Sequence, residues 1–192
     1  MSGARIDRRA GADHRSAREN EETISLLACS TTYPNQKPLN TAFPEVTGKS
    51  LEDSTYQIPQ DFSGQPVLFL IGYKQKSQFD IDRWLIGLDM KGATLSTYEL
   101  PTIQGLFPRM FQTRIDEGMR KGIPKALWKG VITIYKDGEK VQKFTGNTNP
   151  NNTRVVLLDS AGKIRYFNDE GFSVKGLNEV LDQYENLVTE KP

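Results

Sequence analysis

The chain of 192 residues has one cysteine, Cys29, and one histidine, His14. A single thiol rules out an intramolecular disulfide, and a Cys/His zinc centre or a Cys–His catalytic pair has no second partner in the fold. No apolar run is long enough to form a membrane-spanning helix. The formal net charge is +1, so charge gives no reason to expect nucleic acid as a partner. We predict neither a metal nor a cofactor.

Residues 1–40 are predicted to be a disordered tail, because arginines and acids are mixed there with few apolar side chains. Within the tail, Leu26-Leu27-Ala28-Cys29 resembles a bacterial lipobox, in which the cysteine is lipidated, and residues 30–38 resemble the tether that follows. The apolar segment before Cys29 is shorter than the about 7–15 residues of a signal peptide. Two interpretations stay open, a lipidation site at Cys29 or an ordinary thiol in a flexible tail.

Residues 41–190 are predicted to form one domain, whose pattern is clearest after a Gly-Gln-Pro turn. The apolar run Val67–Ile71 predicts a strand that is buried on both faces, and Gly72 ends it. From Phe79 to Leu88 the apolar residues recur at helical spacing, which predicts an amphipathic helix. Residues 75–78 are therefore expected to be an exposed turn between a strand and a helix.

The remaining pattern predicts an α/β domain. Strands are expected at residues 93–98, 131–135, 154–159 and 164–167, and helices at residues 102–121 and 174–187. Gly48-Lys49 is expected to turn between two extended pieces, and Ser173 is expected to cap the last helix. For residues 139–145 a short helix is favoured over a returning strand. Strands that alternate with helices imply a sheet covered on both sides.

The order strand, turn, helix resembles the thioredoxin-like fold of peroxiredoxins and thiol reductases over roughly residues 43–188. That resemblance implies an N-terminal hairpin and a central mixed sheet flanked by helices. In such folds the turn carries a Cys-x-x-Cys pair, because a thiolate at a helix N-terminus has a lowered pKa. Here Gln75-Lys76-Ser77-Gln78 takes that place, so dithiol exchange has no attacking thiolate. The family's cis-proline would fall near Thr153, and Pro150 comes too early.

A second resemblance covers residues 152–166, with Gly171 after them. The order leucine-aspartate, then glycine-lysine-isoleucine-arginine, an aromatic residue and a glycine is similar to the end of the mitochondrial ATP-synthase assembly factor 10 family. Tyr166 stands where that family has a tryptophan. The resemblance implies a chaperone-like protein for a membrane subunit of ATP synthase, without enzymatic chemistry.

These resemblances locate the candidate partner-binding surface. The turn at residues 75–78 and the loop before the penultimate strand are expected to meet at one edge and to hold an extended peptide. The candidates are Tyr73, Gln75, Lys76, Ser77, Gln78, Trp128, Thr153, Arg165 and Tyr166. For the last two, packing and covering of the sheet is the alternative. Asp80 and Asp82 are interpreted only as acids that suit a helix N-terminus.

The sequence thus predicts a redox-inactive binding or assembly protein at a membrane surface, with a protein client. It would be anchored through Cys29 on the periplasmic side of a bacterial envelope, and the mitochondrial inner membrane or matrix is the alternative location. Two other functions stay open. One is a diverged thiol or peroxide oxidoreductase that works with an outside thiol, and the other is a structural envelope lipoprotein without a defined client.

Overall fold

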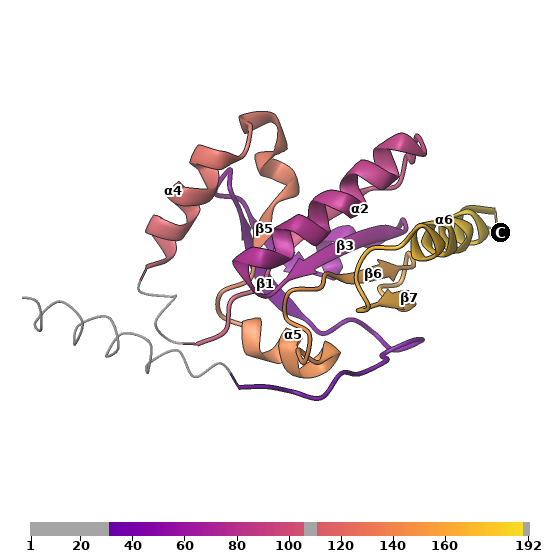
Figure 1. Ribbon diagram of the computed structural model, residues 1–192, viewed down its shortest axis with the longest axis horizontal. Coiled ribbons are helices and arrows are strands. Elements are labelled where there is room, and N and C mark those ends of the chain that lie inside the picture. The colour runs from indigo at the N-terminus through magenta and orange to yellow at the C-terminus, as the bar shows by residue number, and fades with distance from the viewer. Residues whose placement is uncertain (1–30, 106–110, 190–192) are drawn as a thin grey trace, which may run out of the picture. The chain divides into compact units, whose positions relative to one another are not determined.

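The computed structural model describes residues 31–105 and 111–189, and its strands form two sheets (Figure 1). The larger sheet has the order β4-β3-β6-β7, with bounds Thr97–Pro101, Val67–Gly72, Arg154–Leu158 and Ile164–Asn168. The smaller sheet has the order β2-β1-β5, with bounds Thr55–Ile58, Val46–Ser50 and Ile132–Thr133. Only β3 and β4 pair in parallel, and the other pairings within the two sheets are antiparallel. Two parallel bridges, Glu99–Val131 and Thr102–Ile134, join the residues on either side of β5 to β4 and to the residue after it.

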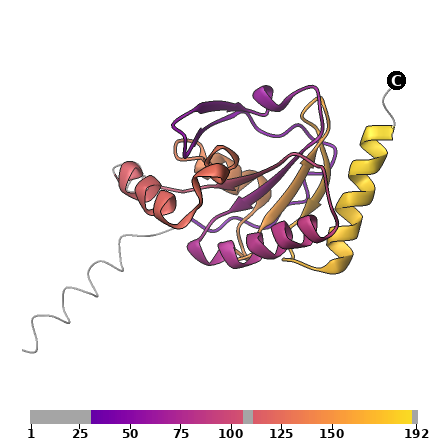
Figure 2. The same cartoon turned by 90° about the horizontal axis from the view of Figure 1, so that it is seen from above.

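Helices lie on both sides of the larger sheet (Figure 2). The α-helices are α2 (Gln78–Met90), α4 (Gln112–Gly122), α5 (Gly138–Thr145) and α6 (Val174–Thr189). Short 3₁₀ turns are η1 (Gln60–Phe62), η2 (Gln75–Ser77) and η3 (Lys125–Gly130). Side chains of α2 and α6 join one hydrophobic cluster, and Val141 of α5 joins the other. None of the helices in the described ranges has the length and apolar character needed to cross a bilayer.

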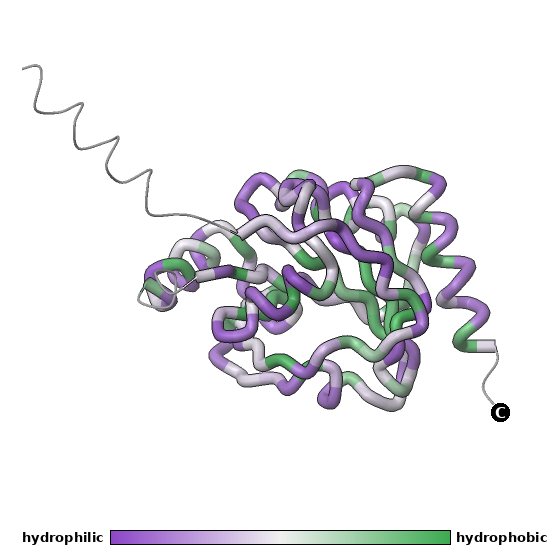
Figure 3. The backbone as a smooth tube through the Cα atoms, turned by 90° about the horizontal axis from the view of Figure 1, so that it is seen from below, coloured by the Kyte–Doolittle hydropathy of each residue, from purple (hydrophilic) through white to green (hydrophobic). Residues whose placement is uncertain are grey.

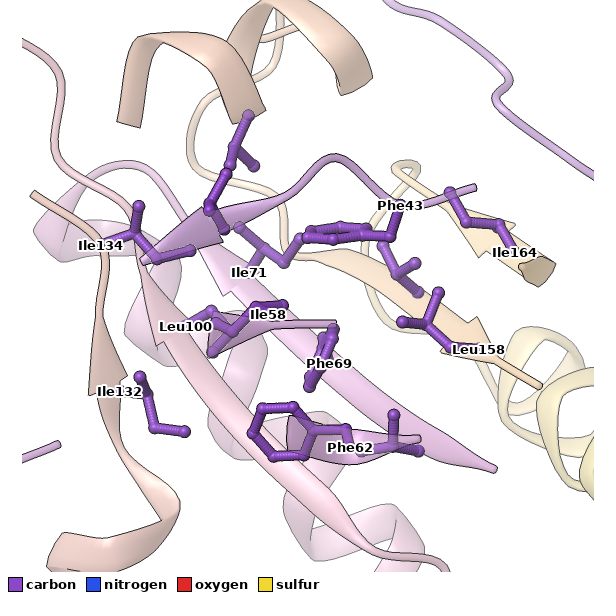
Figure 4. Packing of buried hydrophobic residues seen from close by; sticks show 14 of the residues in the cluster. Phe43, Ile58, Phe62, Phe69, Ile71, Leu100, Ile132, Ile134, Leu158 and Ile164 are labelled. Atoms are coloured by element: carbon purple, nitrogen blue, oxygen red, sulfur yellow. The ribbon is translucent and has the colours of Figure 1, made fainter. Parts of the chain in front are cut away.

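Strand β3 separates the two halves of the core. All six of its residues are buried, since β4 and β6 flank it, α2 and α6 cover one of its faces, and residues of the smaller sheet together with α5 cover the other. Alternate side chains point to opposite faces, so Phe69 and Ile71 enter one cluster (Figure 4) while Leu68 and Leu70 enter the other. Residues of high hydropathy accordingly lie mostly along the central strands (Figure 3).

Several element predictions are confirmed. The buried strand at Val67–Ile71 is β3, the helix expected from Phe79 to Leu88 is α2, and residues 139–145 are helical as favoured. The last helix is α6, and Ser173 Oγ accepts a hydrogen bond from Gly176 N at 3.0 Å, as an N-cap does.

Other boundaries were predicted wrongly. Gly48 does not turn but lies within β1, where a Cβ would come within 2.5 Å of Ile132 Cγ2 on the neighbouring strand. The strand expected at residues 93–98 is β4, which begins only at Thr97. Within the described residues, the helix expected at 102–121 is α4, Gln112–Gly122, and Thr102 is not part of a helix, because its N–H group still donates to Gly72 O in the sheet at 2.8 Å. Residues 106–110 lie outside the described part of the chain.

The domain begins before residue 41, contrary to the predicted extent of the tail. Residues 33–41, here called the strap, lie on the domain through backbone hydrogen bonds. Gln36 N donates to Thr145 O at 3.2 Å, and Asn40 N donates to Ile164 O at 2.8 Å. Composition does not reveal such main-chain bonds, because a polar segment is equally suited to a solvated tail. The rest of the predicted tail, residues 1–30, lies outside the described part of the chain.

Candidate functional site

The turn between β3 and α2 is held by small side chains. A Cβ at Gly72 would come within 2.5 Å of Ser77 Oγ, so glycine allows the turn to close on the end of β3. Ser77 is buried and its hydroxyl donates to Lys74 O at 2.6 Å. The shape of the turn is therefore fixed by Gly72 and Ser77, and Ser77 is not available to a partner.

Three side chains of the turn face outward. Gln75, Lys76 and Gln78 are exposed. Gln78 Nε2 donates to Asp82 Oδ1 at 3.0 Å and to Glu99 Oε2 at 3.1 Å. Burial raises the pKa of Glu99, the hydrogen bond from Gln78 opposes that rise, and the charge of Asp82 adds to it. The outer surface of the turn thus presents two amides and a cation beside two carboxyl groups.

A buried carboxylate, Asp80, connects this turn to the rest of the site. Its Oδ2 accepts a hydrogen bond from Thr153 N at 2.9 Å, and its Oδ1 accepts one from Phe172 N at 2.8 Å. The side chain lies in the first turn of α2 and is 9% exposed. The structure therefore brings the turn and the loop before β6 together. The sequence interpretation gave Asp80 no such role, since any acid suits a helix N-terminus.

Behind the turn lies a buried arginine that the sequence analysis missed. Arg154 opens β6 and is 0% exposed. Its Nη1 donates to Asn149 O at 2.6 Å and to Asn152 O at 2.9 Å, and its guanidinium lies over the Tyr73 ring, 4.9 Å from the centroid. Burial lowers its pKa. The available signal was a charged residue directly before the apolar run Val155–Leu158.

Tyr73 and Thr153 are part of the scaffold. Tyr73 is 8% exposed, its hydroxyl is hydrogen-bonded to the Thr145 hydroxyl, and burial raises its pKa to about 12. Thr153 is fully buried beside Asp80. Both residues lie next to the turn, as the sequence analysis expected, but neither side chain is accessible to a partner.

Trp128 is half-buried in η3, where it packs against α4. Its indole Nε1 donates to Ile123 O at 2.8 Å, and the guanidinium of Arg120 lies 5.7 Å from the ring centroid. Arg120 Nε also donates to Leu51 O at 2.8 Å, which ties α4 to the segment after β1. No hydrogen bond or ring contact of Trp128 within the described ranges reaches residues 75–78.

Arg165 and Tyr166 lie at a different part of the sheet. The antiparallel register sets Ile164 opposite Leu158, so both residues are near the end of β6 that is distant from Thr153. Tyr166 is 9% exposed and its hydroxyl donates to Gly176 O at 3.1 Å, and burial raises its pKa to about 12. The packing alternative is thus the correct one for Tyr166. Arg165 is exposed and pairs with Asp159, its Nη1 lying 3.5 Å from Oδ2.

The predicted lipidation candidate, Cys29, lies outside the described residues. Within residues 31–105 and 111–189, no three His, Cys, Asp or Glu side chains are grouped so that they could hold a metal ion. The site therefore consists of a rigid turn with three exposed polar side chains, supported by Asp80, Thr153, Arg154 and Tyr73.

No protein-family model and no curated protein sequence matches this chain. Solved structures do. The thioredoxin domain of a thiol-disulfide oxidoreductase from Bacteroides vulgatus is 18% identical, with 78% of this chain and 99% of that chain covered and a TM-score of 0.52. A thiol peroxidase from Chromobacterium violaceum is 12% identical over 81% and 92%, with a TM-score of 0.52. BsSco, a member of the Sco family of cytochrome c oxidase assembly proteins, is 10% identical over 82% and 99%, with a TM-score of 0.55.

The chain has a thioredoxin-like fold. The predicted architecture is thereby confirmed, and at these identities the likeness shows the fold alone. The comparisons contain no specific likeness to the ATP-synthase assembly factor family. In the thioredoxin-like fold of this chain, η2 and the first turn of α2 hold Gln75-Lys76-Ser77-Gln78 where the resemblance led us to expect a dithiol.

Proposed function

We propose that this chain is a redox-inactive binding protein that holds a protein client at the turn formed by residues 75–78. One observation carries the proposal. The turn keeps a fixed shape through Gly72 and Asp80, but its exposed side chains are two amides and an amine. The only cysteine of the chain, Cys29, precedes the fold. A site with this composition binds by hydrogen bonds and charge.

The geometry of the turn favours an extended, polar client segment. The amide of Gln75 can donate and accept hydrogen bonds, as the backbone of an extended peptide requires. The amide oxygen of Gln78 can accept one, while its Nε2 donates to Asp82 and Glu99. Lys76 adds a positive charge for an acidic group of the client. Because the backbone of the turn is already fixed, little ordering free energy is lost on binding.

We further propose that the protein acts in the assembly of a membrane complex and reaches the membrane through a lipid on Cys29. The lipobox-like residues 26–29 support the anchor, and the resemblance at residues 152–166 makes ATP synthase the first complex to test. A bacterial envelope is the expected location, with the mitochondrial inner membrane as the alternative. Mass spectrometry of the native amino terminus tests the anchor, since a lipidated Cys29 would be the first residue. An unprocessed terminus with a free thiol would contradict it.

The binding site is tested by site-specific photo-cross-linking in native membranes. A cross-linking amino acid at Gln75 should capture a subunit of a membrane complex, and Lys76→Glu should reduce the yield. Lys163→Glu is the matched control, because Lys163 is also an exposed lysine but lies directly before β7, where it forms a bridge to Ala42. An equal loss of cross-linking yield in both variants, or an unchanged yield in Lys76→Glu, would contradict binding of the client at the turn.

A diverged oxidoreductase is the second candidate, and the likeness to a thiol peroxidase and a thiol-disulfide oxidoreductase favours it. The purified chain should reduce neither insulin disulfides nor hydrogen peroxide if the binding function is correct. Turnover that disappears in Cys29→Ser would favour the oxidoreductase and would place its chemistry on that thiol. Turnover that survives the substitution would contradict the redox-inactive binding function and would favour an oxidoreductase that works with an outside thiol, because the chain has no other cysteine.

A further inference from the structure

Helix α2 carries apolar side chains on its outer face as well as on its inner face. Ile81, Trp84 and Leu88 are buried against the sheet. Phe79, Ile86 and Met90 are 71%, 58% and 82% exposed. The exposed side of a surface helix normally carries polar and charged residues, so three large apolar side chains on that side of α2 are unusual. The outer face of α2 is therefore a surface for which a partner is expected.

The three exposed side chains form one apolar stripe along the helix, with charged residues on both sides of it. Residues 79, 86 and 90 are separated by seven and four positions, which places them on one line of the helix. The other large exposed apolar residues of the described ranges are scattered, and only Val174 and Val188 share an element, at opposite ends of α6; the set is Leu39, Phe111, Leu127, Val174 and Val188. Single exposed apolar residues are ordinary, whereas a stripe of three on one helix marks an interaction surface. Figure 2 shows this helix at the margin of the fold, with its outer side turned away from the sheet.

The charges beside the stripe differ in sign between its two flanks. Helical spacing of 100° per residue sets Arg83 on one side of Ile86, and Asp82 and Asp89 on the other side. All three are exposed. A two-fold axis parallel to the helix would bring the basic flank of one copy against the acidic flank of the other. A two-fold axis perpendicular to the helix would instead set each flank against the same flank of the other copy, so that like charges would face each other.

We propose that the outer face of α2 is a homodimer interface, in which two α2 helices pack in parallel around a two-fold axis. The stripe is complementary to itself, since apolar side chains meet apolar side chains, and the parallel arrangement places Arg83 of each copy beside Asp82 of the other. An isologous contact requires this kind of self-complementary surface. The contact involves one helix face, so the dimer is expected to be weak and concentration-dependent. It does not depend on the client proposed for residues 75–78.

Sedimentation velocity of the full chain from micromolar to sub-millimolar concentration tests the dimer. Ile86→Asp should weaken self-association by roughly tenfold or more, since it puts a charge at the centre of an apolar contact. Leu127→Asp is the matched control, because Leu127 is also 58% exposed but lies in η3. It should leave self-association unchanged. Unfolding midpoints equal to that of the unmodified chain confirm that both variants are folded, as expected for substitutions at exposed positions.

Charge reversal tests the arrangement. Arg83→Asp should weaken the dimer, and the double variant Arg83→Asp with Asp82→Arg should restore it, because the opposite charges then face each other again. A chain that stays monomeric at every concentration, or a dimer that is unaffected by Ile86→Asp, would overturn the proposal. A dimer that Arg83→Asp leaves unchanged would overturn the parallel arrangement, since a perpendicular axis sets residue 83 against its own copy and the substitution then only exchanges one like-charged pair for another. If the stripe bound only a client helix, the free chain would be monomeric.

Discussion

Asp80 is expected to be the residue of the candidate site on which the free energy of unfolding depends most. Its carboxylate accepts the backbone N–H groups of Thr153 and Phe172, at 2.9 Å and 2.8 Å. Asp80→Ala leaves both donors without this acceptor, and a buried donor without a partner costs about 1–3 kcal/mol. The Thr153 donor is buried and the Phe172 donor is partly buried, so we expect a loss of about 2–4 kcal/mol in total.

Equilibrium unfolding in urea measures this loss directly. The midpoint should move to lower denaturant concentration with an unchanged slope, since the folded surface area stays the same. Asp80→Asn should lose less, because one amide oxygen can still accept one of the two hydrogen bonds while the NH₂ group faces the other donor. Asp82→Ala is the control, since this exposed acid of the same helix accepts only a side-chain hydrogen bond from Gln78. A loss below about 1 kcal/mol for Asp80→Ala, the size of an ordinary surface hydrogen bond, would refute the reasoning.

Three further predictions follow from single side chains. Burial raises the pKa of Glu99 in the folded chain. The stability that protonated Glu99 contributes is therefore complete below the pKa of the unfolded carboxyl and is lost as the pH rises through the raised pKa. Glu99→Gln should flatten the pH dependence of Tm between these two pKa values. Tyr73 has a pKa of about 12, so stability should fall as pH rises from about 10 to that value, and Tyr73→Phe should remove this part of the alkaline transition. Gly146 has a φ of 76° and its absent Cβ would meet the backbone of Asn35, so Gly146→Ala should displace the strap and speed its cleavage in limited proteolysis.

The parts of the fold that the sequence predicted well depend on neighbouring residues in the chain. An apolar run bounded by Pro66 and Gly72 can only be a buried strand or a short buried helix, and its length decided for the strand. Ser173 could be assigned as an N-cap because its hydroxyl and the Gly176 N–H group that donates to it lie three residues apart. Gly162, with a φ of 79°, supplies the turn between β6 and β7 for a reason that is equally local.

The parts that were missed depend on contacts between distant segments. Gly48 looked like a turn residue, but its small size serves the close approach of Ile132, which is far along the chain. Asp80 and Arg154 looked like an ordinary helix acid and an ordinary strand boundary. Their roles come from Phe172 and Tyr73, with which only the tertiary structure brings them together. A sequence pattern gives the type of each residue but not the residues that it contacts. The burial of Asp80 and Arg154 could therefore not be inferred from the sequence.

The same contacts explain how the turn persists without a thiolate. The N-terminus of a helix favours a negative group, which is the reason that a thiol placed there ionises readily. In this chain Asp80 supplies the negative charge within the first turn of α2, and it is saturated by two backbone donors inside the fold. The helix terminus therefore does not require an anion from the exposed positions Gln75, Lys76 and Gln78. Substitution of these three side chains should leave the scaffold intact, which is the property that the binding site proposed at this turn requires.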